Sequence, residues 1–473
     1  MTSKTSDIIV MGNSRKSRNQ KIEKLLAMAN DKGATDNEAK LAREKAARLA
    51  KKNEDNNPKI GTSKELVKYS GSKRQKKYEK KDKKLVIIVS CIILGIVLII
   101  SGIFGGKTII KHRNDRTVRI AFYGLSEEIT SLLKEKIPQE ENIILEFDVI
   151  SEGAFDAALV KDKYDMLFTW KGEITDSLSD SAEDIPQKIF ETMPNSLRDK
   201  KKKCIPIILD HCELAFYQKV LKETDSELPG TFSGYISYLN TAKNKVFSPF
   251  FCNGAEDRIL IDLVGAIVLA EGGLNAYNKL IDELRKTESL ENLLDVKLNG
   301  SGLTLRSVLD LLKGWPGQGF THPSWYNGRG NDLLYFAEDG QLGSFFTLLS
   351  EHRKIPYNVI KNYDSYLFPP DVSANDYGLI APAVSCMLLS DNSNCKRYIG
   401  SFFTEDAQTE LSDKTCLAPV HYRAQAYDRQ ADDVRFWAAS CAGGALPDLY
   451  YAVYQRKPEE LKKICGEIRG YVR

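Results

Sequence analysis

The longest stretch of the chain without a charged side chain is the apolar run at residues 85–106, LVIIVSCIILGIVLIISGIFGG. An α-helix rises about 1.5 Å per residue, so this run is long enough to cross the roughly 30 Å hydrocarbon core of a bilayer. A helix also satisfies every backbone polar group inside the membrane. We therefore predict one transmembrane helix over residues 85–106.

Beyond this run, strand-like and helix-like segments alternate. The strand-like segments are 117–124, 142–150 and 164–170, and the helix-like segments are 126–137 and 153–160. Ser126 is a good N-cap for the first helix, which carries two acidic residues at its positive end. The alternation predicts a β-α-β-α-β unit with parallel strands and right-handed crossovers, and hence an α/β fold.

Two aromatic residues follow from this topology as candidate ligand contacts. Tyr123 ends the first predicted strand and Trp170 ends the third. Ligands of open α/β sheets bind at the carboxyl ends of the strands, so we expect both side chains at a ligand site. Packing of Trp170 at the end of the core is an equally good interpretation.

The segment IPIILDHCELAFYQKVL, residues 205–221, contains two apolar runs separated by Asp210 and His211. We expect the chain to cross here into a second lobe, with Asp210 at a hinge. His211 is interpreted as a hydrogen-bonding hinge residue and not as a catalytic base. Nearer the C-terminus, Thr404 is a candidate N-cap of a helix. Pro419 prevents this helix from continuing.

The charge distribution divides the chain at the apolar run. Residues 1–84 hold 24 Lys and Arg against 11 Asp and Glu, whereas the rest of the chain holds 43 against 53. Eight of the basic residues lie in 72–84, directly before the run, so the N-terminus is predicted to be cytoplasmic and the larger part extracytoplasmic. Cleavage and lipidation at Cys91 is a weaker alternative, because a further apolar run follows this cysteine.

The basic segment contains a predicted helical hairpin. Residues 21–30 and 35–52 have helical apolar periodicity, and Thr35 and Glu38 form a capping box. This hairpin, at about 21–52, resembles a small bacterial and phage module of unknown function. No aromatic residues alternate with the charges, so we expect contact with anionic membrane lipid and no binding of nucleic acid.

The larger part of the chain resembles a known family. The ordered series YDMLFTW, IPIILDHCELAFYQKVL, LPGTFSGYISYL, LLYFAEDGQLGSFFTLL, DYGLIAPA and FFTEDAQTELSDKTCLAPVH is similar to extracellular solute-binding proteins of bacterial ABC transporters, in the carbohydrate-binding branch of the type 2 periplasmic binding fold. The resemblance runs from about residue 117 to residue 473. It implies two lobes around a hinged cleft, preceded by the transmembrane helix and the cytoplasmic hairpin.

The resemblance also implies domain bounds and ligand contacts. The first lobe is expected at about 117–209 and 357–404, and the second at about 210–356 and 405–473. Candidate contacts, besides Tyr123 and Trp170, are Asp210, Phe251, Asn253, Trp325 and Trp437. Trp315 and Trp325 occupy a glycine-rich loop that could cover the cleft, whereas packing of Trp437 in a helix is as good an interpretation as ligand contact.

The sequence has little that indicates catalysis. The five histidines show no metal-ligand spacing, and neither a G-x-S-x-G motif nor a phosphate-binding glycine loop occurs. Eight cysteines lie outside the apolar run without a C-x-x-C pair, which argues against zinc. We therefore expect no enzymatic activity, no cofactor and no metal.

Two functions agree with these features. The first is a membrane-anchored, extracytoplasmic solute-binding protein that captures a carbohydrate or oligosaccharide and delivers it to ABC permease subunits. The second is a transmembrane sensor or scaffold, in which the outer domain signals ligand binding to the cytoplasmic hairpin.

Overall fold

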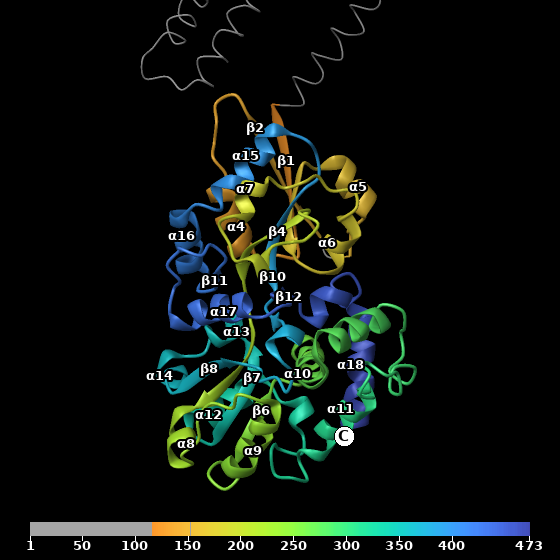
Figure 1. Cartoon of the computed structure of the whole chain (residues 1–473), viewed down its shortest axis with the longest axis vertical. Helices are drawn as coiled ribbons and strands as arrows, with labels where there is room; N and C mark the ends of the chain where they lie inside the picture. Colours follow the sequence, from red (N-terminus) through yellow and green to blue (C-terminus); the bar gives the residue numbers. More distant parts are fainter. Residues whose placement is uncertain (1–115, 152) are drawn as a thin grey trace, which may run out of the picture. The chain divides into compact units, whose positions relative to one another are not determined.

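The computed structural model of the protein describes residues 116–151 and 153–473 (Figure 1). The predictions for the hairpin at 21–52, for the basic segment 1–84 and for the transmembrane helix at 85–106 lie outside the described residues.

The first sheet has six strands in the order β11-β4-β10-β3-β1-β2. These strands are β1 Thr117–Tyr123, β2 Ile144–Ile150, β3 Met166–Trp170, β4 Cys204–Leu209, β10 Ala383–Leu388 and β11 Ala418–Pro419. The first three strands are parallel, and β10 is inserted antiparallel between β3 and β4. The predicted β-α-β-α-β unit is therefore confirmed.

Helices connect the parallel strands of this sheet. They are α4 Glu127–Lys136, α5 Ala157–Lys163 and α6 Glu173–Leu178. The Ser126 hydroxyl accepts a hydrogen bond from the Ile129 amide at 3.2 Å, so Ser126 caps α4 as its sequence predicts. Later helices complete this lobe, namely α15 Ser393–Ser401, α16 Glu405–Thr415 and α17 Arg429–Ser440.

The second sheet has four strands in the order β6-β7-β5-β8. They are β5 Cys212–Tyr217, β6 Ser248–Cys252, β7 Leu342–Leu348 and β8 Tyr363–Leu367. Its helices include α8 Gln218–Glu223, α9 Phe232–Ala242, α10 Asp257–Leu284, α11 Leu305–Gly314, α12 Gly330–Glu338, α13 Leu349–His352 and α18 Pro458–Val472. Each sheet packs against its own hydrophobic core, and we call the two units the first lobe and the second lobe.

Helix α10 organises the core of the second lobe. Of the described helices, it is the one long and apolar enough to cross a membrane, and 78% of its most apolar window is buried. Its buried side chains run from Ile259 to Leu284 and contact α11, α18 and β7. Burial in a protein core therefore accounts for its apolar character.

The chain passes between the lobes at Asp210 and His211, because β4 and β5 belong to different sheets. This first crossing lies where the sequence predicts it. A second crossing connects β8 with β10, and it contains β9 Leu379–Ile380, which pairs with β12 Ala445–Leu446. The last crossing leads from β12 through the π-helix η4, Tyr450–Tyr454, to α18.

The expected lobe bounds near the C-terminus differ from the structure. Strand β8 lies in the second lobe, because it pairs with the outer edge of β5. Helix α16 and strand β11 lie in the first lobe, because β11 pairs with the edge of β4 and Leu411 is buried in the first core. The return to the second lobe thus comes after β12, more than thirty residues later than the bound expected near residue 405.

Candidate functional site

A hollow of about 370 Å³ lies where the first lobe meets the start of α10. Its lining comes from the end of β1, from the first turn of α10 and from η4 and the residue that follows it: Tyr123, Gly124, Glu256, Asp257, Arg258, Tyr450, Tyr451 and Gln455. We call it the interlobe pocket. Gly124 has φ +65°, and a Cβ atom at this position would lie 2.7 Å from Nε2 of Gln455, so both backbone geometry and space favour glycine here.

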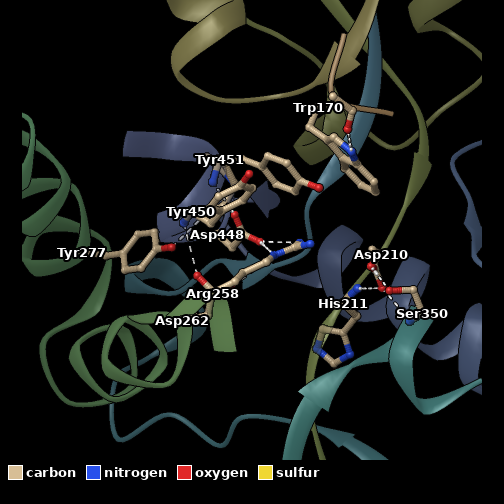
Figure 2. Close-up of polar contacts among 12 residues, drawn as sticks. Trp170, Asp210, His211, Arg258, Asp262, Tyr277, Ser350, Asp448, Tyr450 and Tyr451 are labelled. Carbon is tan, nitrogen blue, oxygen red and sulfur yellow. Dashed lines mark hydrogen bonds and ion pairs between the residues drawn. The ribbon is translucent and has the colours of Figure 1, made fainter. Parts of the chain in front are cut away.

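Arg258 joins two buried acidic side chains beside this pocket (Figure 2). Its Nε and Nη2 atoms donate to Oδ2 of Asp448 at 3.2 and 2.7 Å, and Nε lies 3.7 Å from Oδ2 of Asp262. The same carboxylates accept backbone N–H groups, Asp448 from Tyr451 at 2.8 Å and Asp262 from Tyr450 at 3.3 Å. We call these five residues the Arg258 cluster.

The cluster holds the two tyrosines of the pocket. The guanidinium carbon of Arg258 lies 4.5 Å from the ring centre of Tyr451 and 5.4 Å from that of Tyr450. Cation–π attraction adds to the backbone hydrogen bonds that the carboxylates accept. The start of η4 is therefore fixed to α10 by both its backbone and its rings.

The charges of the cluster nearly balance. Burial, together with the negative charge of Asp448, raises the pKa of Asp262 well above its usual value, so this carboxyl group favours its neutral form. Burial opposes the charge of Arg258, but Tyr451 and the two carboxylates outweigh it and raise the pKa of Arg258. One cation then faces one carboxylate, and the cluster presents little net charge to the pocket.

Within residues 116–151 and 153–473, one group of side chains has atoms close enough to hold a metal ion. Cys212, Asp262 and Asp448 each offer a ligand atom, and these atoms lie within 4.8 Å of one another. Burial raises the pKa of the Cys212 thiol, which opposes formation of the thiolate that binds metals. Arg258 already supplies a positive charge beside both acidic side chains.

Of the two aromatic residues predicted from the strand ends, Tyr123 lines the interlobe pocket and Trp170 does not. The Trp170 indole N–H donates to the Gly124 carbonyl at 3.0 Å, and its ring stacks on Tyr451 with the ring centres 4.8 Å apart. Trp170 is only 6% exposed. Trp170 therefore supports the ring of Tyr451, which lines the pocket, and does not line the pocket itself.

Gln455 adds an acceptor to the pocket. Its Nε2 lies 3.4 Å from Oγ1 of Thr169, and its Oε1 has no hydrogen-bond partner among the described residues, although the side chain is 94% buried. A buried acceptor without a partner is costly unless a ligand or water satisfies it. Gln455 was missed from the sequence, as were Arg258, Tyr450 and Tyr451; the aromatic run LYYAVYQ was the one local signal.

Asp210 lies at the first crossing and outside the lining of the pocket. Its Oδ1 accepts the His211 and Ser350 amides at 2.8 and 3.0 Å, and its Oδ2 accepts the Ser350 hydroxyl at 2.6 Å (Figure 2). Burial raises the pKa of Asp210, although the hydrogen bonds from Ser350 act in the opposite direction. These bonds connect the start of β5 to the start of α13.

The other predicted residues lie apart from the interlobe pocket. Trp437 of α17 contacts His211 and Tyr366, with ring centres 5.6 and 5.4 Å away, and so packs at the first crossing. Asn253 lines a second hollow, and its Nδ2 donates to Oε2 of Glu256 at 2.9 Å. Phe251 is 4% exposed and packs against Phe336 inside the second lobe.

The loop predicted to cover the cleft is packed in the core of the second lobe. Trp315 and Trp325 are 0% and 2% exposed and belong to the large core cluster. The loop backbone lies on Gly254, where a Cβ atom would come within 2.9 Å of the Trp325 carbonyl oxygen. The expectation that Trp325 contacts a ligand in the cleft is therefore replaced by a packing role.

Comparisons with known protein families and with curated proteins gave one match, near the N-terminus. A family model described as a protein of unknown function (DUF2786) matches residues 20–54, where the sequence predicts the hairpin. The chain matches no curated protein by sequence.

Several solved structures are similar to the chain. The bacterial solute receptor AcbH, described as having an exclusive preference for β-D-galactopyranose, aligns with a TM-score of 0.59 at 10% identity, over 75% of this chain and 96% of its own. The binding protein msme of Bacillus subtilis, in an open conformation, aligns at 0.56 and 12% identity over 76% and 96%. A Bacillus licheniformis sugar transporter in complex with stachyose aligns at 0.50 and 10% identity over 75% and 98%. The described part of the chain therefore has the fold of the bacterial solute-binding proteins, as its sequence resemblance indicates.

Proposed function

We propose that residues 117–473 form an extracytoplasmic receptor that captures a carbohydrate between its two lobes for an ABC importer. The observation that carries this proposal is the lining of the interlobe pocket, which comes from the end of a first-lobe strand, the start of a second-lobe helix and the last crossing. A ligand bound there contacts both lobes. The volume of the interlobe pocket, about 370 Å³, falls within the usual range for small-molecule sites, about 300–1,000 Å³.

The chemistry of the pocket favours an uncharged polyol. Arg258 is already paired with Asp448, and Asp257 with Arg469 at 2.7 Å, so the described lining offers an anionic ligand the Glu256 carboxylate and no unpaired cation. Gln455 and Glu256 offer acceptors for hydroxyl groups, and the partly exposed side chain of Tyr450 offers an apolar surface. The similar structures named above include one that prefers galactopyranose and one that holds stachyose, which supports a sugar ligand.

Lobe closure would supply the signal that a permease reads. Three crossings connect the lobes, and a ligand that contacts both lobes binds the closed arrangement better than the open one. This function needs no catalytic step, and the similar structures are receptors. The proposed arrangement places residues 85–106 in the membrane as a single-pass anchor, residues 1–84 in the cytoplasm and the two lobes outside.

The experiment measures binding and turnover with the full-length protein in lipid nanodiscs. We expect a neutral sugar to bind and to be recovered unchanged by mass spectrometry. The variant Gln455→Met keeps the volume of the side chain but removes its acceptor, so affinity should fall by about 1–2 kcal/mol, roughly 5- to 30-fold, with little change in melting temperature.

Gln218→Met is the matched control. Gln218 donates to the exposed Asp364 at 2.9 Å and lines a separate hollow on α8, so its replacement should leave affinity unchanged. Chemical conversion of the bound sugar would refute a pure receptor. Equal affinities of the two glutamine variants would remove the interlobe pocket as the site.

A second candidate function is a sensor that transmits ligand binding across the membrane. The observation that favours it is the family-model match at residues 20–54, on the other side of the predicted membrane helix from the two lobes. Purification of the tagged full-length protein from membranes distinguishes the two. Recovery of permease subunits supports the importer, whereas ligand-dependent recovery of a cytoplasmic protein that requires residues 20–54 supports the sensor.

A further inference from the structure

A second hollow of about 250 Å³ lies next to the interlobe pocket. It is found at the carboxyl ends of the parallel strands β6 and β7, between α12 and the first turn of α10. Glu256 lines both hollows, so the two are adjacent along the start of α10. We call it the second hollow.

The second hollow combines an apolar floor with a polar rim. Aliphatic side chains from α10, α12 and the segment after α13 form the floor, among them Ile259, Leu334 and Ile355. The rim carries Asn253, Asn331, Thr347, Glu351 and Lys354. Three rim groups are already paired with neighbours, since Lys354 contacts Glu351 at 2.6 Å and Asn253 donates to Glu256. The remaining rim groups are neutral donors and acceptors.

The two hollows lie at the edges of the two sheets where ligands of α/β folds collect. The interlobe pocket adjoins the end of β1, and the second hollow adjoins the ends of β6 and β7. A third hollow of about 700 Å³, around α8, shares no lining residue with either and includes no parallel strand end. Position at the strand ends and a shared wall therefore distinguish the second hollow from an ordinary surface depression.

Glu256 is the link between the hollows. Its Oε2 accepts the amide of Asn253. Burial and the nearby carboxylate of Glu351 both raise the pKa of Glu256. The two acidic groups therefore interact across the boundary between the hollows. A ligand that extends from one hollow to the other must pass this carboxylate.

We propose that the second hollow is a second sugar subsite, so that the ligand is an oligosaccharide of at least two units. This inference rests on the proposed function of the interlobe pocket. One pyranose unit lies against Tyr450 and Gln455, and the next places its C–H face on the aliphatic floor and its hydroxyl groups at the rim. Glu256 lies between the two units, where it accepts a hydroxyl hydrogen bond from the bound chain.

The test titrates the full-length protein in nanodiscs with matched chain-length series by isothermal calorimetry. The probes are glucose, maltose and maltotriose; xylose, xylobiose and xylotriose; N-acetylglucosamine and its dimer and trimer; and galactose, raffinose and stachyose. We expect at least one series to bind, with an affinity at least tenfold higher for its two-unit or longer member than for its monosaccharide.

The variant Leu334→Trp fills the second hollow from a partly exposed position on α12. We expect it to remove this gain and to leave monosaccharide affinity within twofold. Leu311→Trp, at a partly buried position on α11 outside both linings, is the matched control and should retain the gain. If Leu334→Trp lowers the melting temperature, Asn331→Ala at the exposed rim is used in its place. We expect this variant to reduce the affinity advantage of the longer sugar by a smaller factor.

The outcomes separate this inference from the proposed function. Binding of monosaccharides and longer chains with equal affinity, unchanged by Leu334→Trp, would overturn the second subsite and leave the receptor function standing. Loss of monosaccharide binding in Leu334→Trp, with folding intact, would also overturn it, because the two hollows would then form one site. No binding in any series would remove the receptor function and the subsite together.

Discussion

The first and the last crossing between the lobes use the same device with different partners. At the first crossing, the buried carboxylate of Asp210 accepts the amides of His211 and Ser350. At the last crossing, the buried carboxylate of Asp448 accepts the amide of Tyr451 at 2.8 Å. In both places an aspartate fixes the backbone where the chain changes lobe.

The difference lies in charge and in distance from the pocket. Asp210 is held by neutral donors alone among its described hydrogen bonds, and it does not line the interlobe pocket. Asp448 is paired with Arg258, whose guanidinium lies against the two tyrosines of the pocket. The first crossing thus has a structural aspartate, whereas at the last crossing the aspartate connects the fold to the candidate site.

The largest expected effect is at the last crossing. Arg258→Met removes the cation and leaves Asp448 and Asp262 buried without it, and loss of one partner from such a buried pair costs about 3–5 kcal/mol. We expect the free energy of unfolding, measured with urea, to fall by that amount. Affinity for the sugar should fall as well, because the rings of Tyr450 and Tyr451 lose their support.

Arg306→Met is the matched control for this prediction. Arg306 pairs with Asp295 at 2.7 Å, but the two side chains are 42% and 75% exposed, so the loss should be about 0–1 kcal/mol. Equal losses in the two variants would contradict the difference between an exposed pair and the buried cluster.

The next effect is a pH dependence at the first crossing. Burial lowers the pKa of His211 from 6.5 to about 4, and both ring nitrogens lack a hydrogen-bond partner among the described residues. As the pH falls, the unfolded chain therefore binds the proton first. Stability is complete above about pH 6.5 and is lost toward pH 4, by about 3 kcal/mol for this shift.

His211→Leu should remove this part of the acid loss. We expect the difference in unfolding free energy between variant and parent, followed from pH 7.5 to 4 by urea titration, to shift in favour of the variant as pH falls. His322→Leu, at an exposed position, is the control and should leave the slope unchanged. A parallel pH profile for His211→Leu and the parent would show that His211 is not buried in its neutral form.

The smallest effect tests whether Asp210 is structural or a ligand contact. Asp210→Ala leaves the Ser350 and His211 amides without their acceptor, so we expect a loss of about 1–3 kcal/mol in unfolding free energy and nearly unchanged sugar affinity. Ser350→Ala removes one hydroxyl donor and should cost about 1 kcal/mol. A stable Asp210→Ala protein with much weaker sugar binding would restore Asp210 as a ligand contact.

Local patterns in the sequence determined the strands, the helix starts and the first crossing. Strand-like segments predicted β1, β2 and β3, and the Ser126 cap and the break at Asp210 lie where the sequence indicates them. Thr404 caps α16 as predicted, with its hydroxyl accepting the Ala407 amide at 3.2 Å. These features depend on residues within a few positions of one another, which is why a single sequence displays them.

Only the tertiary structure decided which aromatic and charged residues meet. Trp325, in a predicted loop, is buried in the core of the second lobe, whereas Trp170, at the end of a predicted strand, stacks on Tyr451 beside the pocket. Arg258 and Asp448 are 190 residues apart, and they pair because α10 and the last crossing pack together. No local periodicity encodes such a pairing, since it depends on how segments far apart in the sequence pack against one another.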